Sequence, residues 1–262
     1  MVKKKYFIIL KIAKNQISLG DMIRVLEFFK NRDYEIVTDN NNNSFFKNFN
    51  KKNILTYSKF KNQKMINQNI INLVIGHKIE NSIFDINNYL RKKINKVSTY
   101  ELFKKLNKFK KKIKIKKLNK KKYKVGINKI VPQNWKIKSY PQKYWGNLNT
   151  ILQENKNIKV SFQKKMSLEN YVKWIQSCDI IISVVGLGVH IAKYFDKKII
   201  MLVGPTDFAE SKSDEYIYKI FPEKRCHVHK KKLNLKYKNC TCMKNIKVNK
   251  IINKLYKIIN YE

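Results

Sequence analysis

Apolar residues in the second half of the chain form unbroken runs, separated by segments with the spacing of amphipathic helices. Four runs predict β-strands: 123–127, 158–162, 179–185 and 198–203. Four segments predict helices: 141–152, the stretch after the capping residue Ser167, 189–195, and the closing stretch 248–259. Strands that alternate with helices of about ten residues predict a parallel α/β sheet. Unbroken apolar runs fit a sheet that is covered on both faces.

The first half carries the same alternation less clearly. Apolar runs predict strands at 6–12, 35–38, 54–57 and 70–75. After the first run, Met22, Val25, Leu26 and Phe29 recur at helical spacing and predict a helix that ends near Asn31. Two further helical patterns span 83–91 and 98–109. We therefore expect a second, smaller α/β unit in this half.

A lysine-dense block at 104–124 contains neither glycine nor proline and is the best candidate for a domain boundary. We place the boundary so that residues 1–120 form an N-terminal domain and residues 121–262 a C-terminal domain. The alternative is a solvated helix and strand edge inside one domain.

The net charge and the composition narrow the range of functions that the chain could have. A hydrophobic share of 43%, with 14 Phe and 15 Tyr, indicates a folded protein and excludes a disordered one. The formal net charge of +40 fits nucleic acid or an anionic lipid surface. The basic residues are almost all lysine, however, and lie along the whole chain beside abundant Asn and Ile. Because these residues share A/T-rich codons, we attribute the charge to base composition and expect no nucleic-acid partner.

The chain lacks an apolar run of the ~20 residues that a transmembrane helix needs. Lys11 interrupts the first apolar stretch, so we interpret it as a strand and not as a signal peptide. We expect a cytoplasmic protein that makes peripheral contact with the anionic inner membrane.

Four loops carry candidate chemistry, because ligands of parallel α/β sheets bind beyond the carboxyl ends of the strands. These loops are Gly20-Asp21, the stretch 134–141, Val185–His190 and Gly204–Asp207. A glycine-containing turn that leads into a helix favours a phosphate. Each loop also has a purely structural interpretation, such as a tight turn, a helix cap or a histidine packed in the core.

In this order, the loops resemble glycosyltransferase family 9, which includes the lipopolysaccharide heptosyltransferases. The matching segments are Leu19-Gly20-Asp21, Lys138-Ser139-Tyr140-Pro141, Gly188-Val189-His190-Ile191-Ala192, Gly204-Pro205-Thr206 and Cys242-Met243-Lys244-Asn245-Ile246. The match is close from about Tyr123 to the end and thin before it.

The resemblance implies two facing Rossmann-like domains of the GT-B type with parallel sheets, the N-terminal one reduced and on the acceptor side. It implies sugar transfer from an ADP-heptose-like donor, held by the C-terminal domain, to a lipopolysaccharide or other glycan or lipid-linked acceptor. Asp21 would be the catalytic base, and no metal would be required for this inverting reaction. The implied donor-binding residues are Lys138, Gln163, Gly186, Gly188, His190, Gly204 and Thr206.

Two alternatives stay open, the first because of a departure from the family's motif and the second because of the net charge of +40. The family's turn carries an aspartate followed by a hydroxyl residue, and here these positions are Val185 and Gly186. The first alternative is therefore a degenerate paralogue that binds sugar nucleotide without transferring it. The second is a basic nucleic-acid-binding protein.

The cysteines suggest a separate site. Cys226, His229, Cys240 and Cys242 offer four ligands for a tetrahedral structural zinc ion. The alternative is a set of free thiols in a lysine-rich loop, since the spacing between Cys240 and Cys242 is tighter than is usual for zinc. Cys178 is expected to be buried at the end of a helix.

Overall fold

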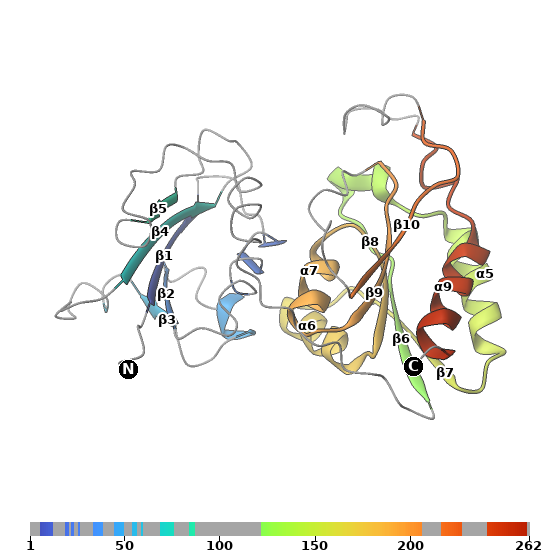
Figure 1. Ribbon diagram of the computed structural model, residues 1–262, viewed down its shortest axis with the longest axis horizontal. Helices are drawn as coiled ribbons and strands as arrows, with labels where there is room; N and C mark the ends of the chain where they lie inside the picture. Colours follow the sequence, from blue (N-terminus) through green and yellow to red (C-terminus); the bar gives the residue numbers. More distant parts are fainter. Residues whose placement is uncertain are drawn as a thin grey trace. The chain divides into compact units, whose positions relative to one another are not determined.

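The chain divides into two compact units, Met1–Lys112 and Ile113–Glu262, which we describe separately. The structure is a computed structural model, shown in Figure 1. It describes residues 6–12, 19–20, 22–23, 26, 34–38, 45–49, 54–56, 59, 69–75, 84–86, 122–205, 216–226 and 240–260. The predicted boundary between residues 120 and 121 lies outside these residues.

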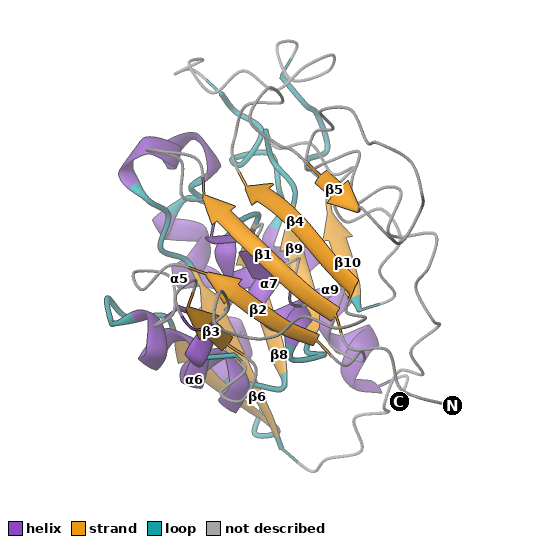
Figure 2. Ribbon diagram, turned by 90° about the vertical axis from the view of Figure 1, so that its left-hand side faces the viewer, coloured by secondary structure: helices purple, strands orange, loops and turns teal. Residues whose placement is uncertain are grey.

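The N-terminal unit contains a five-stranded sheet in the order β3-β2-β1-β4-β5. Its strands are β1 (Tyr6–Ile12), β2 (Tyr34–Thr38), β3 (Ile54–Thr56), β4 (Asn69–Ile75) and β5 (Phe84–Ile86). Figure 2 shows these strands side by side. The first four are parallel and follow the predicted apolar runs closely. The helical residues Met22 and Leu26 after β1 are fully buried, as their apolar spacing predicted, and Ile23 is buried beside them.

The fifth strand corrects one prediction. The helical pattern assigned to 83–91 contains β5 instead, which pairs antiparallel with β4. Phe84 and Ile86 alternate with Asp85 and lie opposite Leu73 and Ile71. The backbone hydrogen bonds offered by the edge of β4 outweigh a weak local helical pattern. The sheet is therefore mostly parallel, and the helix predicted at 98–109 lies outside the described residues.

The C-terminal unit is a fully parallel sheet in the order β10-β9-β8-β6-β7. Its strands are β6 (Tyr123–Asn128), β7 (Ile158–Phe162), β8 (Ile180–Val184), β9 (Lys198–Leu202) and β10 (Ile217–Ile220). Every residue of β8 and β9 is buried, as expected for central strands covered on both faces. Strand β10 was not predicted, because its four residues include the polar Tyr218 and Lys219.

Helices cover both faces of this sheet. Helices α5 (Gln142–Gln153) and α9 (Val248–Asn260) lie on one face, and α6 (Leu168–Ser177) and α7 (Leu187–Tyr194) on the other (Figure 1). The short 3₁₀ helix η2 (Gln133–Lys138) precedes α5 and was not predicted. The Ser167 hydroxyl accepts the Asn170 N–H at 3.3 Å, which caps α6 as predicted and stabilises it by about 1 kcal/mol.

The apolar core of this unit lies between the sheet and the pair α5 and α9. Strand residues alternate, so Val125, Ile127, Ile182 and Val184 point into this core. The closing helix contributes Ile251, Ile252, Leu255 and Ile258, all buried. Each such side chain contributes about 1.5–3 kcal/mol relative to an exposed position. The core therefore holds the carboxyl ends of the strands firmly in place.

Candidate functional site

The strand order places a topological switch point between β6 and β8. From β6 the chain crosses to β7 on one side, and it then returns to continue through β8, β9 and β10 on the other. The connections on either side of the switch point diverge and leave a crevice beyond the carboxyl ends of the strands, where ligands of open α/β sheets bind. Asn128 ends β6, and Val184 ends β8.

A buried polar network lies at this switch point, on the face covered by α6 and α7. The Asn128 side-chain amide donates to Ser183 Oγ at 2.7 Å, and the Tyr171 hydroxyl donates to Asn128 Oδ1 at 2.8 Å. Ser183 Oγ donates in turn to the Val184 carbonyl at 2.7 Å. Asn128 and Ser183 are 4% and 0% exposed, so all of these bonds form away from water. Burial raises the pKa of Tyr171, which keeps its hydroxyl a neutral donor.

Sequence reasoning did not predict this network. It predicted Tyr171 only as part of the helix that follows Ser167, and it interpreted 179–185 as an unbroken apolar strand. The available signal was an asparagine at the end of one apolar run and a serine inside the neighbouring run. Fully bonded polar groups in a buried sheet fix one arrangement of the surrounding elements.

The predicted donor-binding turn leads from β8 into α7. Gly186 is the N-cap residue of α7, has an extended backbone and makes no side-chain cap. Gly188 lies in the first turn of the helix, packed so closely against Asn128 and Tyr171 that a Cβ atom there would overlap both side chains. The glycine at 188 is thus required by packing against the polar network. His190 is half-buried in the same helix.

The second predicted phosphate turn follows β9. Gly204 is buried and packs against the Met243 side chain, which leaves no room for a Cβ atom. This contact joins the end of β9 to the segment that precedes α9. Thr206 lies outside the described residues, and so does the proposed base Asp21.

Lys138 and Gln163 are placed by the loops after β6 and β7. The Lys138 ammonium lies 4.0 Å from the ring centroid of Trp135, within the same 3₁₀ helix η2. The Gln163 backbone N–H donates to the Ile127 carbonyl at 2.9 Å, and its side-chain oxygen accepts the Ile130 N–H at 2.9 Å. Gln163 therefore ties together the two loops that border one side of the switch point.

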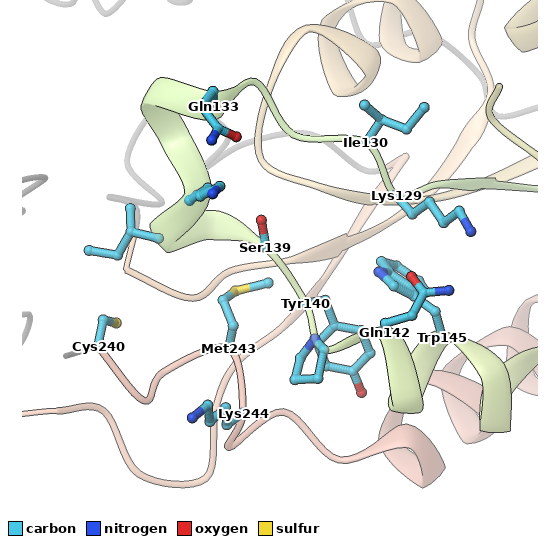
Figure 3. Close-up of a pocket in the computed structure, with 13 residues that line it drawn as sticks. Lys129, Ile130, Gln133, Ser139, Tyr140, Gln142, Trp145, Cys240, Met243 and Lys244 are labelled. Carbon is cyan, nitrogen blue, oxygen red and sulfur yellow. The ribbon is translucent and has the colours of Figure 1, made fainter. Parts of the chain in front are cut away.

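A pocket of about 890 Å³ opens at the same sheet edge, on the face covered by α5 and α9. Figure 3 shows side chains from the loop before α5 around it, together with Met243 and Lys244 from the segment before α9. Lysines from both segments line it: Lys129, Lys136 and Lys244. None of the predicted donor-binding residues that the structure describes lines this pocket.

Two aromatic side chains form the inner wall of the pocket. The Tyr140 hydroxyl donates to the Ile246 carbonyl at 2.9 Å, and burial raises the pKa of Tyr140. Its ring meets the Trp145 ring edge to face at 4.9 Å between centroids. The indole N–H of Trp145 is buried and makes no hydrogen bond with the described residues. The pocket therefore combines a basic rim with an aromatic wall, a combination that fits an anionic ligand.

Three cysteine thiols meet beside this pocket. The sulfur atoms of Cys226, Cys240 and Cys242 all lie within 4.8 Å of one another, close enough to hold a metal ion. Burial raises the pKa of Cys240 to about 12 and also raises that of Cys242. The fourth predicted ligand, His229, lies outside the described residues. Cys178 is separate and fully buried at the end of α6, as predicted.

Within the part of the chain that the structure describes, no helix has the length and apolar character needed to span a membrane.

Comparison of the whole chain with solved structures places this geometry in a known fold. A glycosyltransferase family 9 protein from Veillonella parvula matches with a TM-score of 0.61 and 12% identity, over 100% of this chain and 99% of that one. The chain therefore has the fold of glycosyltransferase family 9. No family model and no curated protein matches the sequence.

Two heptosyltransferases from E. coli are also similar. ADP-heptose lipopolysaccharide heptosyltransferase II matches with a TM-score of 0.59 and 11% identity, over 98% of this chain and 99% of that one. Heptosyltransferase WaaC, solved with ADP-2-deoxy-2-fluoro heptose, matches with a TM-score of 0.56 and 12% identity, over 96% and 99%. The predicted α/β fold of GT-B type is thus confirmed, and the reduction of the N-terminal domain stays a prediction.

Proposed function

We propose that this protein is a glycosyltransferase that moves a heptose-like sugar from an ADP-sugar donor to a lipopolysaccharide-type or other surface-glycan acceptor. The observation that carries the proposal is where the family-like motifs lie. Lys138 ends η2 in the connection after β6, Gly186 is the N-cap residue of α7 after β8, and Gly204 follows β9. These strands carry their loops to one edge of one parallel sheet, where a nucleotide would bind.

In this proposal the C-terminal domain (121–262) holds the donor, and the N-terminal domain (1–120) presents the acceptor. Heptosyltransferase WaaC, which was solved with an ADP-sugar, supports a nucleoside diphosphate as the leaving group. Lys138 and the backbone N–H groups at the start of α7 would stabilise the negative charge that develops on this group. Such pre-oriented charge stabilisation is usually the largest single contribution to catalysis.

The other predicted site residues have roles that follow the same division between an acceptor domain and a donor domain. Asp21 would remove the proton from the acceptor hydroxyl, which then attacks the anomeric carbon from the side opposite the nucleotide and inverts its configuration. Gln163, Gly188, His190, Gly204 and Thr206 would surround the donor. The lysine and the helix start supply the positive charge, so the transfer step needs no metal. Added Mg²⁺ or Mn²⁺ should therefore leave turnover unchanged.

The donor sugar has fewer expected polar partners in this chain than in the family. Val185 and Gly186 stand where the family carries a carboxylate and a hydroxyl residue, so the donor sugar loses polar partners. This substitution motivates one alternative, a chain that binds sugar nucleotide without transferring it. The substitution Asp21→Ala separates the two, because it abolishes turnover only in an enzyme and leaves donor binding in place.

We also propose a cytoplasmic location with peripheral contact to anionic lipid, in keeping with the net charge of +40. The Lys-rich composition gives the nucleic-acid alternative no specific support, because Arg, the residue preferred for phosphate clamps, occurs only at Arg24, Arg32, Arg91 and Arg225. A zinc ion at Cys226, His229, Cys240 and Cys242 would be structural and take no part in transfer.

The direct test is transfer of isotope-labelled sugar from a panel of ADP-, UDP- and GDP-sugars to a lipopolysaccharide core acceptor, alongside a thermal-shift screen with the same nucleotides. A ligand that binds only the folded state raises its melting temperature by mass action. We expect ADP-sugars to give the largest shift and ADP-heptose to give transfer. Failure of every donor in both assays would reject the proposal, whereas binding without transfer would support the non-catalytic alternative.

A further inference from the structure

We propose that the pocket on the face covered by α5 and α9 binds a phosphorylated saccharide, at a site separate from the donor-binding turns. Three features of the pocket carry this assignment: a buried hydrogen-bond donor in its wall, lysines around its rim, and uncharged polar side chains between them. Binding at this site does not require that the chain transfers sugar.

The buried donor is the indole N–H of Trp145 on α5. Trp145 is 2% exposed and lines the pocket, yet its N–H makes no hydrogen bond with the described residues. Buried polar groups are almost always hydrogen-bonded, and the Trp174 indole N–H, which donates to Ser161 Oγ at 2.9 Å, follows that rule. A ligand oxygen would supply the acceptor that Trp145 lacks. Gln142 lies beside Trp145 in Figure 3, and its exposed side chain can turn aside to admit that oxygen.

Positive charge reaches the rim of the pocket from two segments of the chain. Lys129 and Lys136 belong to the connection 129–141 between β6 and α5, and Lys244 belongs to the segment 240–247 before α9. Neither segment contains an acidic residue, so no carboxylate of either segment neutralises these lysines. A phosphate monoester carries up to two negative charges at neutral pH, which matches the two exposed lysines, Lys136 and Lys244. The rim therefore suits a phosphate better than a singly charged carboxylate.

The uncharged polar side chains of the lining suit the hydroxyl groups of a sugar. Gln133, Ser139 and Gln142 are exposed and line the pocket, and an amide or a hydroxyl group can both donate and accept hydrogen bonds. Figure 3 shows the Ser139 hydroxyl directed into the space that the lining residues surround. The volume of about 890 Å³ lies within the range of small-molecule sites and exceeds what a phosphate ion needs. These features indicate a sugar phosphate and not a free phosphate ion.

The pocket adjoins the predicted donor site through the helix η2. Lys136 lines the pocket, whereas Lys138, in the same helix, lies 4.0 Å from the Trp135 ring centroid and does not line it. Gly188 lies in α7, on the opposite face of the sheet. The two sites therefore use different described residues, and their occupancy can be measured independently. A ligand held by Lys136 would also restrict the helix that carries Lys138.

A phosphorylated saccharide has two sources, a free sugar phosphate and a phosphorylated unit of the acceptor glycan, and the second source rests on the proposed function. Two probes distinguish them: glucose 6-phosphate and a phosphorylated lipopolysaccharide core oligosaccharide. Binding of the core at least about tenfold tighter than glucose 6-phosphate, lost when the core is dephosphorylated, would assign the pocket to the acceptor. Equal or tighter binding of glucose 6-phosphate would assign it to a free sugar phosphate.

The experiment titrates these probes, inorganic phosphate and ADP into the full chain and measures the heat of binding. We expect the pair Lys136→Gln and Lys244→Gln to weaken sugar-phosphate binding at least about tenfold and ADP binding less than about fivefold. The matched pair Lys143→Gln and Lys156→Gln removes the same charge from exposed lysines that do not line the pocket, and should change neither. Lys138→Ala should weaken ADP binding alone. Inorganic phosphate should bind at least about tenfold more weakly than the sugar phosphate.

A second measurement uses the wild-type chain and so does not depend on how a variant folds. The indole N–H signals are followed by NMR during the titration: that of Trp145 should move downfield as it gains an acceptor, and that of Trp174 should stay in place because it is already bonded.

Four results would each overturn the proposal: no binding of either saccharide probe, equal binding of inorganic phosphate, equal losses in the two lysine pairs, or an unmoved Trp145 signal at saturation. A wild-type chain that binds the sugar phosphate but not ADP would instead reject the proposed donor site and leave this one standing.

Discussion

The carboxyl edge of the C-terminal sheet is built differently on its two faces. On the face covered by α6 and α7, Asn128, Ser183 and Tyr171 form a hydrogen-bonded network, and Gly188 packs closely against Asn128 and Tyr171. On the face covered by α5 and α9, a pocket of about 890 Å³ stands open, with a buried indole N–H at Trp145 that makes no hydrogen bond to the described residues. The face covered by α6 and α7 is filled by these contacts, whereas the face covered by α5 and α9 has room for a ligand.

This difference changes what the glycine motif means. A Gly-x-Gly turn before a helix usually suggests that a phosphate approaches the backbone. Here the second glycine, Gly188, is needed because the side chains beneath it occupy the space of a Cβ atom. The start of α7 can still offer N–H groups to a ligand. Its position is fixed by packing against the polar network. The same turn therefore both packs in the interior and presents N–H groups to a ligand.

The largest expected effect is at Lys138, which the proposed function places on the diphosphate. We predict that Lys138→Ala lowers kcat/KM for sugar transfer by about 100-fold to 1000-fold, the usual loss when one charge-stabilising group is removed. Lys143→Ala, an exposed lysine in the first turn of α5, is the matched control and should leave transfer unchanged. Equal rates for both variants would show that Lys138 only packs over Trp135.

The next largest effect tests how Gly188 packs against the polar network of Asn128, Ser183 and Tyr171. We predict that Gly188→Ala lowers the free energy of unfolding by about 1–3 kcal/mol, because its methyl group must displace Asn128 or Tyr171. Gly146 is a matched control in helix α5, since a Cβ atom there meets nothing within 4 Å. Gly146→Ala should raise stability by about 0.5–1 kcal/mol. Denaturant unfolding measures both, and a Gly188→Ala protein as stable as wild type would contradict the packing account.

A smaller effect tests the hydrogen bonds of the same face. Tyr171→Phe leaves the buried Asn128 oxygen without its donor and should cost about 1–3 kcal/mol. Tyr256→Phe, at a half-buried position on α9, serves as the control and should change stability less. Calorimetric melting compares the two.

Tyr171→Phe should also change how the free energy of unfolding depends on pH. Because burial raises the folded-state pKa of Tyr171 above 10.0, its contribution is fully present at lower pH and is lost as pH rises beyond that value. Tyr171→Phe should therefore lose less stability than wild type in alkaline solution. An unchanged alkaline slope would argue that the hydroxyl ionises freely.

The smallest expected effect concerns the pocket on the face covered by α5 and α9. Lys244 is exposed at the rim of the pocket, so we predict that Lys244→Gln weakens ADP binding by less than about fivefold, the range of an exposed charge pair. This residual effect should disappear at high salt. A loss as large as that of Lys138→Ala would move the diphosphate into the pocket and away from the start of α7.

Sequence patterns predicted the parts of the fold that depend on local burial. Strands β6, β7, β8 and β9 and helices α5, α6 and α7 lie within a residue or two of the predicted positions. Short elements at the sheet edges escaped prediction. Strand β5 was predicted as helix, and β10 was missed, because pairing with a neighbouring strand and not the local pattern determines both.

The site was harder to predict than the fold. The sequence indicated Cys226, Cys240 and Cys242 as potential ligands, and their sulfur atoms do lie within 4.8 Å of one another. The pocket and the Asn128 network depend on side chains that are 43 to 55 residues apart in sequence, and spacing carries no information on such contacts. Asp21, Thr206 and His229 stay predictions.

Isothermal titration of ADP into the full chain tests the central claim most directly. The account predicts one binding site per chain, at least tenfold weaker binding in Lys138→Ala, and unchanged binding in Gly146→Ala. An absence of binding heat with ADP, UDP and GDP alike, in protein shown to be folded, would contradict it.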